Sequence, residues 1–192
     1  MKLFGETSTE QLSTLAQTTI ELYLSEIAAG EKSALSALYE ETRIAVYGFA
    51  LSIVKNVCDA EDVLQETYVK IWLSAAGYSA RGKPMAWILT ITKNLAKSML
   101  RERGKTADIP EDDWQMFYAP SKGASSEDRI VLQAALGALK DEERQIITLH
   151  AVSGLKHVEI AQLLELPLST VLSKYSRARK KLQAALEEGD FK

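Results

Sequence analysis

The stretch of sequence that decides the fold is LKHVEIAQLLELPLSTVLSKYSRARKKL, which runs from Leu155 to Leu182. Its first part has apolar residues at helical spacing from Ile160 to Leu164, and this pattern predicts a short helix with one apolar face. Pro167 then interrupts the pattern. Because proline has no backbone N–H and suits the first turn of a helix, a second helix is expected to begin beside it. In that second helix an apolar stripe runs from Val171 to Leu182.

The second predicted helix is strongly basic. From Leu172 to Lys181 it has five cations and no acid. A packed first helix that presents a basic second helix is the plan of a helix-turn-helix, whose second helix enters the DNA major groove. An ordinary helical hairpin with a solvated basic end has the same pattern, so this segment alone leaves both interpretations open.

Charge is distributed unevenly along the chain, although the formal net charge is only −3. From Lys93 to Lys105 five cations stand against one acid, and from Asp108 to Asp128 six acids stand against one cation. Together with the basic second helix, this gives two basic segments separated by an acidic one. Such segregation of charge favours contact with nucleic acid, although the small net charge does not reveal the segregation.

The remaining composition limits the class of protein. With 192 residues, 46% of them apolar, the chain can bury two small cores or one medium-sized core. Cys58 is the only cysteine, so the chain can form neither an internal disulfide nor a zinc site built from thiolates. His150 and His157 lack the spacing of metal ligands and are expected to be structural, so neither a metal site nor a cofactor is predicted.

Neither a signal peptide nor a membrane span is predicted. The N-terminus is polar after Phe4, and no apolar run approaches the length needed to cross a bilayer. We therefore expect a cytoplasmic protein without stable membrane insertion.

Helical periodicity dominates the chain and strand alternation is nearly absent, which predicts an all-α fold. Residues 105–125 combine proline, glycine, serine and acids without a sustained period, and they are expected to form an acidic flexible linker. This linker separates two small helical domains, of which the C-terminal one contains the helix-turn-helix. The expected boundaries are 1–26 for a helical N-terminal extension, 27–104 for the first domain and 126–188 for the second.

Apolar residues within the acidic linker, Trp114 and Phe117 among them, are unusual for a simple spacer. One interpretation is that they dock on a partner. A second is that they anchor the linker to the basic faces of the same chain, which would then be closed on itself. A plain disordered tether, which would leave the chain extended, is the third.

The N-terminal half is predicted to consist of successive helices. They span the approximate ranges 8–30, 32–55, 60–72 and 84–103, with a short connection from Asn56 to Asp59. In the third helix Asp62, Gln65 and Glu66 lie at i, i+3 and i+4, so they share a face opposite an apolar stripe. Such a face is either a binding surface or an ordinary solvated one.

Cations and aromatic residues come together around the last of these helices. A row of cations with one asparagine occupies one face of it, and a basic, glycine-containing loop with a tyrosine precedes it. The residues concerned are Tyr78, Arg81, Lys83, Trp87, Lys93, Asn94, Lys97 and Arg101. Rings that stack on unpaired bases, with cations that follow the phosphates, suit single-stranded nucleic acid. A cation row is otherwise an ordinary solvated face.

Taken together, three segments resemble a bacterial RNA polymerase sigma factor. They are DAEDVLQETYVKIW from Asp59, YSARGKPMAWILTITKNLAKSMLRERGK from Tyr78, and LGALKDEERQIITLHAVSGLKHVEIAQLLELPLSTVLSKYSRARKKL from Leu136. The resemblance is to the small extracytoplasmic-function (ECF, group IV) type, which keeps only the region 2 and region 4 domains. It covers roughly Ile27 to Leu186 with the motifs in the expected order, so it implies a sigma region 2 domain, a linker and a sigma region 4 domain.

The resemblance implies a role for each group of residues. Asp62, Gln65 and Glu66 match the face that docks on the coiled coil of the largest polymerase subunit. Asn94 matches a position that helps to read the melted −10 promoter element, with the neighbouring cations near phosphates. The loop before this helix lies where such factors capture a flipped base, with Trp87 beside it. The recognition helix for the −35 element is matched by Thr170, Leu172, Ser173, Lys174 and Arg177.

Three residues depart from the family pattern. Thr90 stands where relatives commonly have arginine, and Leu172 where they commonly have arginine or lysine. Glu165 replaces the usual small residue of the turn. These departures concern the strength of promoter contacts and not the fold.

The resemblance implies a dissociable polymerase subunit that recognises and melts −10/−35 promoters to initiate transcription. Its expected partners are core RNA polymerase, promoter DNA and an anti-sigma factor. Two alternatives stay open: a helix-turn-helix regulator that works without polymerase, and a sigma-like protein that binds an anti-sigma factor but no DNA. The sequence has no nucleophile–base arrangement, phosphate loop or metal cluster, so neither catalytic residues nor an enzymatic activity are predicted.

Overall fold

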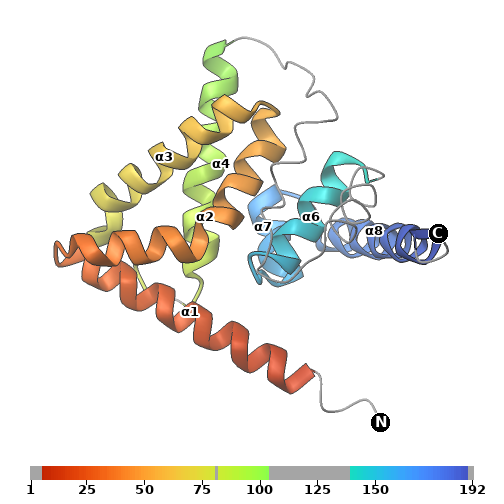
Figure 1. Ribbon diagram of the computed structural model, residues 1–192, viewed down its shortest axis with the longest axis horizontal. Coiled ribbons are helices and arrows are strands. Elements are labelled where there is room, and N and C mark those ends of the chain that lie inside the picture. The colour runs from red at the N-terminus through yellow and green to blue at the C-terminus, as the bar shows by residue number, and fades with distance from the viewer. Residues whose placement is uncertain (1–5, 81, 104–138, 190–192) are drawn as a thin grey trace.

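The computed structural model describes residues 6–80, 82–103 and 139–189, and side chains within 15–80, 82–102 and 139–185. In these ranges the regular elements are seven α-helices and one short 3-10 turn, so the predicted all-α fold is confirmed (Figure 1). The helices are α1 (Glu6–Ala28), α2 (Lys32–Val54), α3 (Val57–Ser74), α4 (Pro84–Arg103), α6 (Asp141–Ala151), α7 (His157–Leu164) and α8 (Leu168–Gly189). The 3-10 turn, η1, is Ala75–Gly77.

Helices α1 to α4 form an N-terminal unit. In Figure 1, α2, α3 and α4 stand together and α1 lies across one end of them. The core of this unit includes Leu38 and Phe49 of α2, Ile71 of α3 and Ile88 of α4, all fully buried. Because each such side chain contributes roughly 1.5–3 kcal/mol when it leaves water, the apolar stripes fix how the helices face one another.

Local signals set most helix ends where the sequence predicts them. Pro84 opens α4, and α8 starts directly after Pro167. The predicted connection from Asn56 to Asp59 is wrong, because α3 already begins at Val57. Asn56 Oδ1 accepts a hydrogen bond from the backbone N–H of Asp59 at 3.0 Å, which caps the helix and lets it start early.

A buried polar contact fixes α3 against α2. The Thr42 hydroxyl and the Tyr68 hydroxyl lie 2.7 Å apart, and Thr42 Oγ1 also donates to the backbone oxygen of Leu38. Burial raises the pKa of the Tyr68 phenol, so this group stays neutral. The contact holds one side of α3 inward, and the opposite side therefore faces solvent.

Helices α6, α7 and α8 form a C-terminal unit with a helix-turn-helix, as predicted. Its buried side chains include Ile146 and Leu149 of α6, Ile160 of α7 and Val171 and Ala178 of α8. All of these except Ala178 belong to the same apolar cluster as the core of the N-terminal unit. Glu165 ends α7 in a left-handed conformation, with φ 59° and ψ 37°. The backbone N–H of Leu166 donates to the oxygen of Ala161 at 3.0 Å, which closes the turn.

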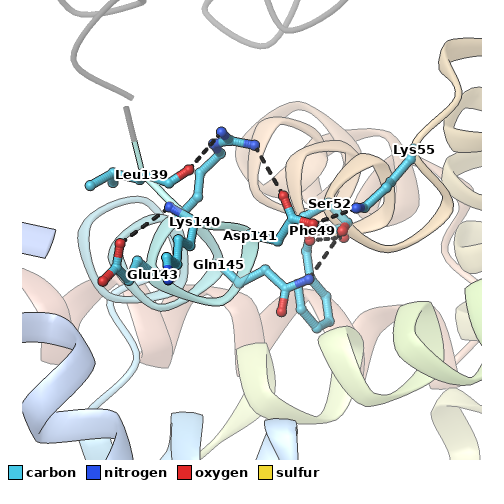
Figure 2. A network of polar contacts seen from close by, with 9 residues as sticks. Phe49, Ser52, Lys55, Leu139, Lys140, Asp141, Glu143 and Gln145 are labelled. Atoms are coloured by element: carbon cyan, nitrogen blue, oxygen red, sulfur yellow. Dashed lines mark hydrogen bonds and ion pairs between the residues drawn. The ribbon is translucent and has the colours of Figure 1, made fainter. Parts of the chain in front are cut away.

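The two units contact each other through α2 and α6, and through α4 and α7. Figure 2 shows the polar part of the first contact. Gln145 Nε2 donates to the backbone oxygen of Ser52 at 3.0 Å, and Lys55 forms an ion pair with Asp141. The N-terminal and C-terminal units are therefore packed against each other.

Among the helices described here, none is long and apolar enough to cross a membrane. The predicted linker, 105–125, with Trp114 and Phe117, lies outside the described residues.

Candidate nucleic-acid interface

The predicted docking face lies on the solvent side of α3. Asp62, Gln65 and Glu66 are all exposed. The same side continues with two large apolar residues, because Val69 is 55% and Leu73 is 70% exposed. Acidic, amide and apolar side chains therefore form one exposed strip, the α3 strip, along this helix.

The predicted cation row on α4 is divided between solvent and the interface. Asn94, Lys97 and Arg101 are exposed, whereas Lys93 is buried. Lys93 Nζ donates to the backbone oxygen of Leu163 at 2.8 Å and to Glu165 Oε1 at 2.8 Å. Both acceptors belong to the C-terminal unit, so Lys93 contacts the end of α7 and not solvent.

Glu165 joins two cations of α4. Besides Lys93, its Oε2 lies 3.6 Å from Nζ of Lys97. The hydrogen bond from Lys93, and then the charges of Lys93 and Lys97, lower the pKa of the Glu165 carboxyl. Glu165, in the turn of the helix-turn-helix, therefore pairs with cations that the resemblance to sigma factors assigns to promoter DNA.

The connection before α4 brings two rings together. The Tyr78 and Trp87 ring centroids are 5.1 Å apart with a tilt of 53°. Lys83 is exposed, and its Nζ lies 3.8 Å from Glu159 of α7. Arg81 lies outside the described residues.

The predicted recognition residues lie at the start of α8. Leu172, Ser173 and Arg177 are exposed, whereas Thr170 and Lys174 are half-buried. Lys174 forms an ion pair with Glu142 of α6, so its charge is partly neutralised within the unit. In this stretch the most accessible cation among the predicted −35 residues is Arg177.

A second ion pair holds α8 on α6 further along. Lys181 Nζ donates to Glu143 Oε2 at 2.7 Å, and the same oxygen accepts from the backbone N–H of Lys140 at 3.2 Å. The hydrogen bond from Lys181 lowers the pKa of Glu143, although burial acts in the other direction. These contacts fix the orientation of the basic helix.

Three rings pack beside the recognition helix. His150 and His157 stack with centroids 4.5 Å apart, and Tyr175 of α8 meets both edge-on. His150 Nδ1 lies 2.9 Å from the backbone oxygen of Leu155, and because a carbonyl only accepts, this nitrogen donates. Burial, and then the nearby His150, lower the pKa of His157. Both histidines thus have a structural place, as the sequence indicates.

Sequence reasoning missed the acids that hold these surfaces. Glu21, Glu142 and Glu159 each contact a residue of a predicted site from another helix. In the sequence, each of these acids looks like an ordinary acid on a helix surface, and no motif around it distinguishes it from the others. Glu165 had a signal, since an acid is unusual in the turn of this motif. Within the described residues no cluster of histidine, cysteine or acids could hold a metal ion.

Comparisons with known proteins agree with this architecture. Residues 38–106 match the Sigma-70 region 2 family, and residues 129–182 match Sigma-70, region 4. The ECF RNA polymerase sigma factor SigK of Mycobacterium ulcerans is 31% identical over 176 residues, which cover 85% of this chain and 91% of that protein. SigK of Mycobacterium tuberculosis is 26% identical over 175 residues, covering 88% of this chain and 94% of its own.

Two solved structures have a similar fold. CnrH, in complex with the cytosolic domain of CnrY, has a TM-score of 0.59 at 23% identity and covers 88% of this chain and 98% of its own. The sigma factor RpoE of Bartonella quintana, in complex with the anti-sigma factor NepR, has a TM-score of 0.58 at 26% identity. The match covers 79% of this chain and 96% of the RpoE chain. The first of these likenesses concerns the fold alone. By its two matched regions and its relatives, the chain belongs to the ECF sigma factors of RNA polymerase.

Proposed function

We propose that this ECF sigma factor, which recognises promoters to initiate transcription, docks on core RNA polymerase through the α3 strip and contacts DNA through two separate surfaces. The observation that carries the proposal is that exposed predicted residues lie on three different helices. The α3 strip faces solvent, exposed −10 residues lie on α4, and exposed −35 residues lie on α8. A subunit that binds polymerase and two promoter elements at once needs accessible residues on several helices.

The composition of the α3 strip suits a protein partner with arginines and an apolar surface. The carboxylates of Asp62 and Glu66 can accept charge-assisted hydrogen bonds from guanidinium groups. Val69 and Leu73 add apolar area that a partner can remove from water. We assign the strip to core polymerase on this basis.

For the −10 element we propose the exposed residues of α4 and the connection before it. Asn94 offers an amide for a base edge, Lys97 and Arg101 offer cations for phosphates, and the Tyr78–Trp87 pair offers rings for stacking. For the −35 element we propose the start of α8, with Ser173 and Arg177 directed at the groove. The chain itself supplies no catalysis in this proposal, and polymerase performs the chemistry.

An anti-sigma factor is the partner that we propose for regulation. RpoE of Bartonella quintana, which has a similar fold, is known in complex with the anti-sigma factor NepR. The two units of this chain already lie together, so a partner that spans both can hold them in that arrangement.

The first test is in vitro transcription on fragmented genomic DNA, with core polymerase alone and with the chain added. Run-off products that require the chain are expected. Binding to DNA fragments without any effect on transcription would instead support a polymerase-independent regulator. A chain that neither binds DNA with polymerase nor directs transcription would support the sigma-like protein that only binds an anti-sigma factor.

The second test reverses charge on the α3 strip. Asp62→Lys with Glu66→Lys should weaken binding to core polymerase by about 2–5 kcal/mol if the lost pairs are desolvated in the complex. Glu66→Lys alone should weaken binding more than the matched Glu41→Lys, since Glu41 is also exposed but lies on α2 and not on the α3 strip. Helicity should be unchanged, and equal affinity of all variants for core polymerase would contradict the assignment.

A further inference from the structure

Helix α1 contacts the connection between η1 and α4 through the carboxylate of Glu21. Glu21 Oε1 accepts a hydrogen bond from the Tyr78 hydroxyl at 3.0 Å and a second one from the backbone N–H of Gly82 at 2.9 Å. One oxygen thus holds both ends of this connection. Hydrogen bonds to an ionised carboxylate are stronger than those between neutral groups.

The position of Glu21 is itself well fixed. Ile20, Leu24 and Ile27 on the same helix are almost fully buried in the core of the N-terminal unit. Because the helix is anchored on both sides of Glu21, the backbone of Glu21 is fixed beside the connection and its carboxylate stays within reach of it. Glu21 lies before the residues that match Sigma-70 region 2, which begin at 38, whereas Tyr78 and Gly82 lie within them.

Glu21 contacts the aromatic pair through Tyr78, and the backbone further along the connection through Gly82. Tyr78 is half-buried and its ring lies against Trp87, so a hydrogen bond to its hydroxyl sets the direction of the ring. Gly82 has φ +69°, a conformation that residues with a side chain rarely adopt. Glycine visits many other conformations, and the hydrogen bond to its N–H selects this one.

We infer that Glu21 is a positioning residue for base recognition in the melted −10 element, because it orders Tyr78 and the backbone at Gly82 before DNA arrives. This inference rests on the proposed role of the connection in contacting the −10 element. A ring that is already oriented spends less conformational entropy when a base stacks on it. Glu21 therefore acts through Tyr78 and need not touch DNA.

The proposal predicts a loss that is confined to one base. Glu21→Ala should reduce the preference for the captured base by roughly threefold to tenfold, since the side chains it orders must then be fixed on binding. Contacts elsewhere in the promoter and the affinity for core polymerase should not change. Glu21→Gln should lose less than Glu21→Ala, because an amide oxygen can still accept both hydrogen bonds, although without the charge that strengthens them.

The test uses holoenzyme reconstituted from core polymerase and the full chain, with a promoter obtained from the run-off experiment. Labelled non-template-strand oligonucleotides across the −10 element are the probes, each with one position made abasic. The wild type should lose affinity at particular positions. If it loses none, the proposed role of the connection in −10 recognition is wrong, whatever the role of Glu21.

Once the wild type is shown to discriminate between bases, the Glu21 variants are compared with it to test the inference. Support requires that Glu21→Ala discriminates between intact and abasic oligonucleotides roughly threefold to tenfold less than the wild type at one position and resembles the wild type at the others. Glu26→Ala, on the same helix, is the control and should change nothing. A Glu21→Ala variant equal to the wild type, or weakened uniformly at every position, would overturn the inference. Should this variant fail to fold, Tyr78→Phe removes one of the two hydrogen bonds, and wild-type discrimination by Tyr78→Phe overturns it as well.

Discussion

Leu172 and Lys174 lie two residues apart on α8 but have different surroundings. The Leu172 side chain is 46% exposed, whereas Lys174 is half-buried and paired with Glu142. Leucine offers no hydrogen-bond donor to a phosphate. An ion-paired lysine must give up its carboxylate partner before it can bind a phosphate. At the residue scale, the start of α8 therefore has fewer free cations than its sequence suggests.

Replacing Leu172 with arginine should add a phosphate contact. We expect the slope of log affinity against log salt for −35 binding by holoenzyme to steepen by about 0.9 if one more phosphate is neutralised. The measurement is promoter binding across a salt series, and Ala184→Arg, an exposed position further along α8, is the control. A gain confined to one base pair at constant slope would indicate base readout by the new arginine. If neither slope nor base preference changes, Leu172 does not face DNA.

At the scale of elements, the C-terminal unit depends on rings as well as on aliphatic packing. His157 begins α7 and packs between His150 of α6 and Tyr175 of α8, so three helices meet at this cluster. The His157 Nε2 atom is buried and has no hydrogen-bond partner among the residues that the structure describes. A proton there would bring a charge into the cluster beside a second histidine, which is why the pKa of His157 is lowered.

Acidification should therefore destabilise this unit. Because the pKa of His157 is lower in the folded chain, the unfolded chain binds more protons once the pH falls below the ordinary value of about 6.5. The stability that neutral His157 provides is complete above this value and is lost as the pH falls toward the lowered pKa. His157→Phe keeps a ring and removes the titration, so its melting temperature should fall less than that of the wild type on acidification.

Thermal unfolding of the full chain between about pH 7.5 and 5.5 checks this expectation, in a window set by the ordinary histidine pKa. The pKa values of Glu143 and Glu165 are lowered from 4.5, so these groups titrate below that window. Parallel pH profiles of wild type and His157→Phe would show that the cluster is not the source of any pH dependence.

At the scale of the whole molecule, the two units are joined by contacts that also involve predicted DNA-binding residues. Lys93 is buried against Leu163 and Glu165, and Lys97 lies near the same carboxylate. Glu165 adopts a left-handed conformation that favours glycine, yet its side chain reaches both cations. DNA that bound Lys93 would have to displace both Glu165 and the backbone oxygen of Leu163, so we expect the packed arrangement to oppose −10 binding.

Neutralising Glu165 should favour separation of the units. We expect Glu165→Gln to enlarge the mean radius of gyration of the free chain at low salt and to tighten its binding of single-stranded −10 DNA by severalfold at most. The effect should shrink at high salt, because the side chains of Glu165 and Lys97 are 66% and 58% exposed and salt therefore screens their charges. Solution scattering and oligonucleotide binding across a salt series are the measurements.

A matched control removes an ion pair within one unit. Glu40→Gln breaks the exposed pair with Arg43 on α2, 3.2 Å apart, and should leave the radius unchanged. The contact between Gln145 and Ser52 remains in both variants, so opening is expected to be partial. Identical scattering of wild type and Glu165→Gln at every salt concentration would contradict a role for Glu165 in holding the units together.

The sequence by itself determined the features that depend on neighbours along the chain. Pro84 and Pro167 mark helix starts because a missing N–H acts locally, and the apolar stripe from Val171 to Ala178 follows from helical periodicity. The exposed face of Asp62, Gln65 and Glu66 follows from the same spacing. The combination of motifs also sufficed to predict the family.

Only the tertiary structure decided which of the predicted surface residues are free. Lys93 and Lys97 look alike on a helical row, yet one is buried against α7 and the other is exposed. Likewise, nothing around Glu21 in the sequence points to Tyr78, whose hydroxyl it binds. The physical reason is that hydrogen bonds and charge pairing depend on distances between atoms that packing brings together, often from opposite ends of the chain. Periodicity assigns a residue to a face, but the helix packed on that face decides its partner.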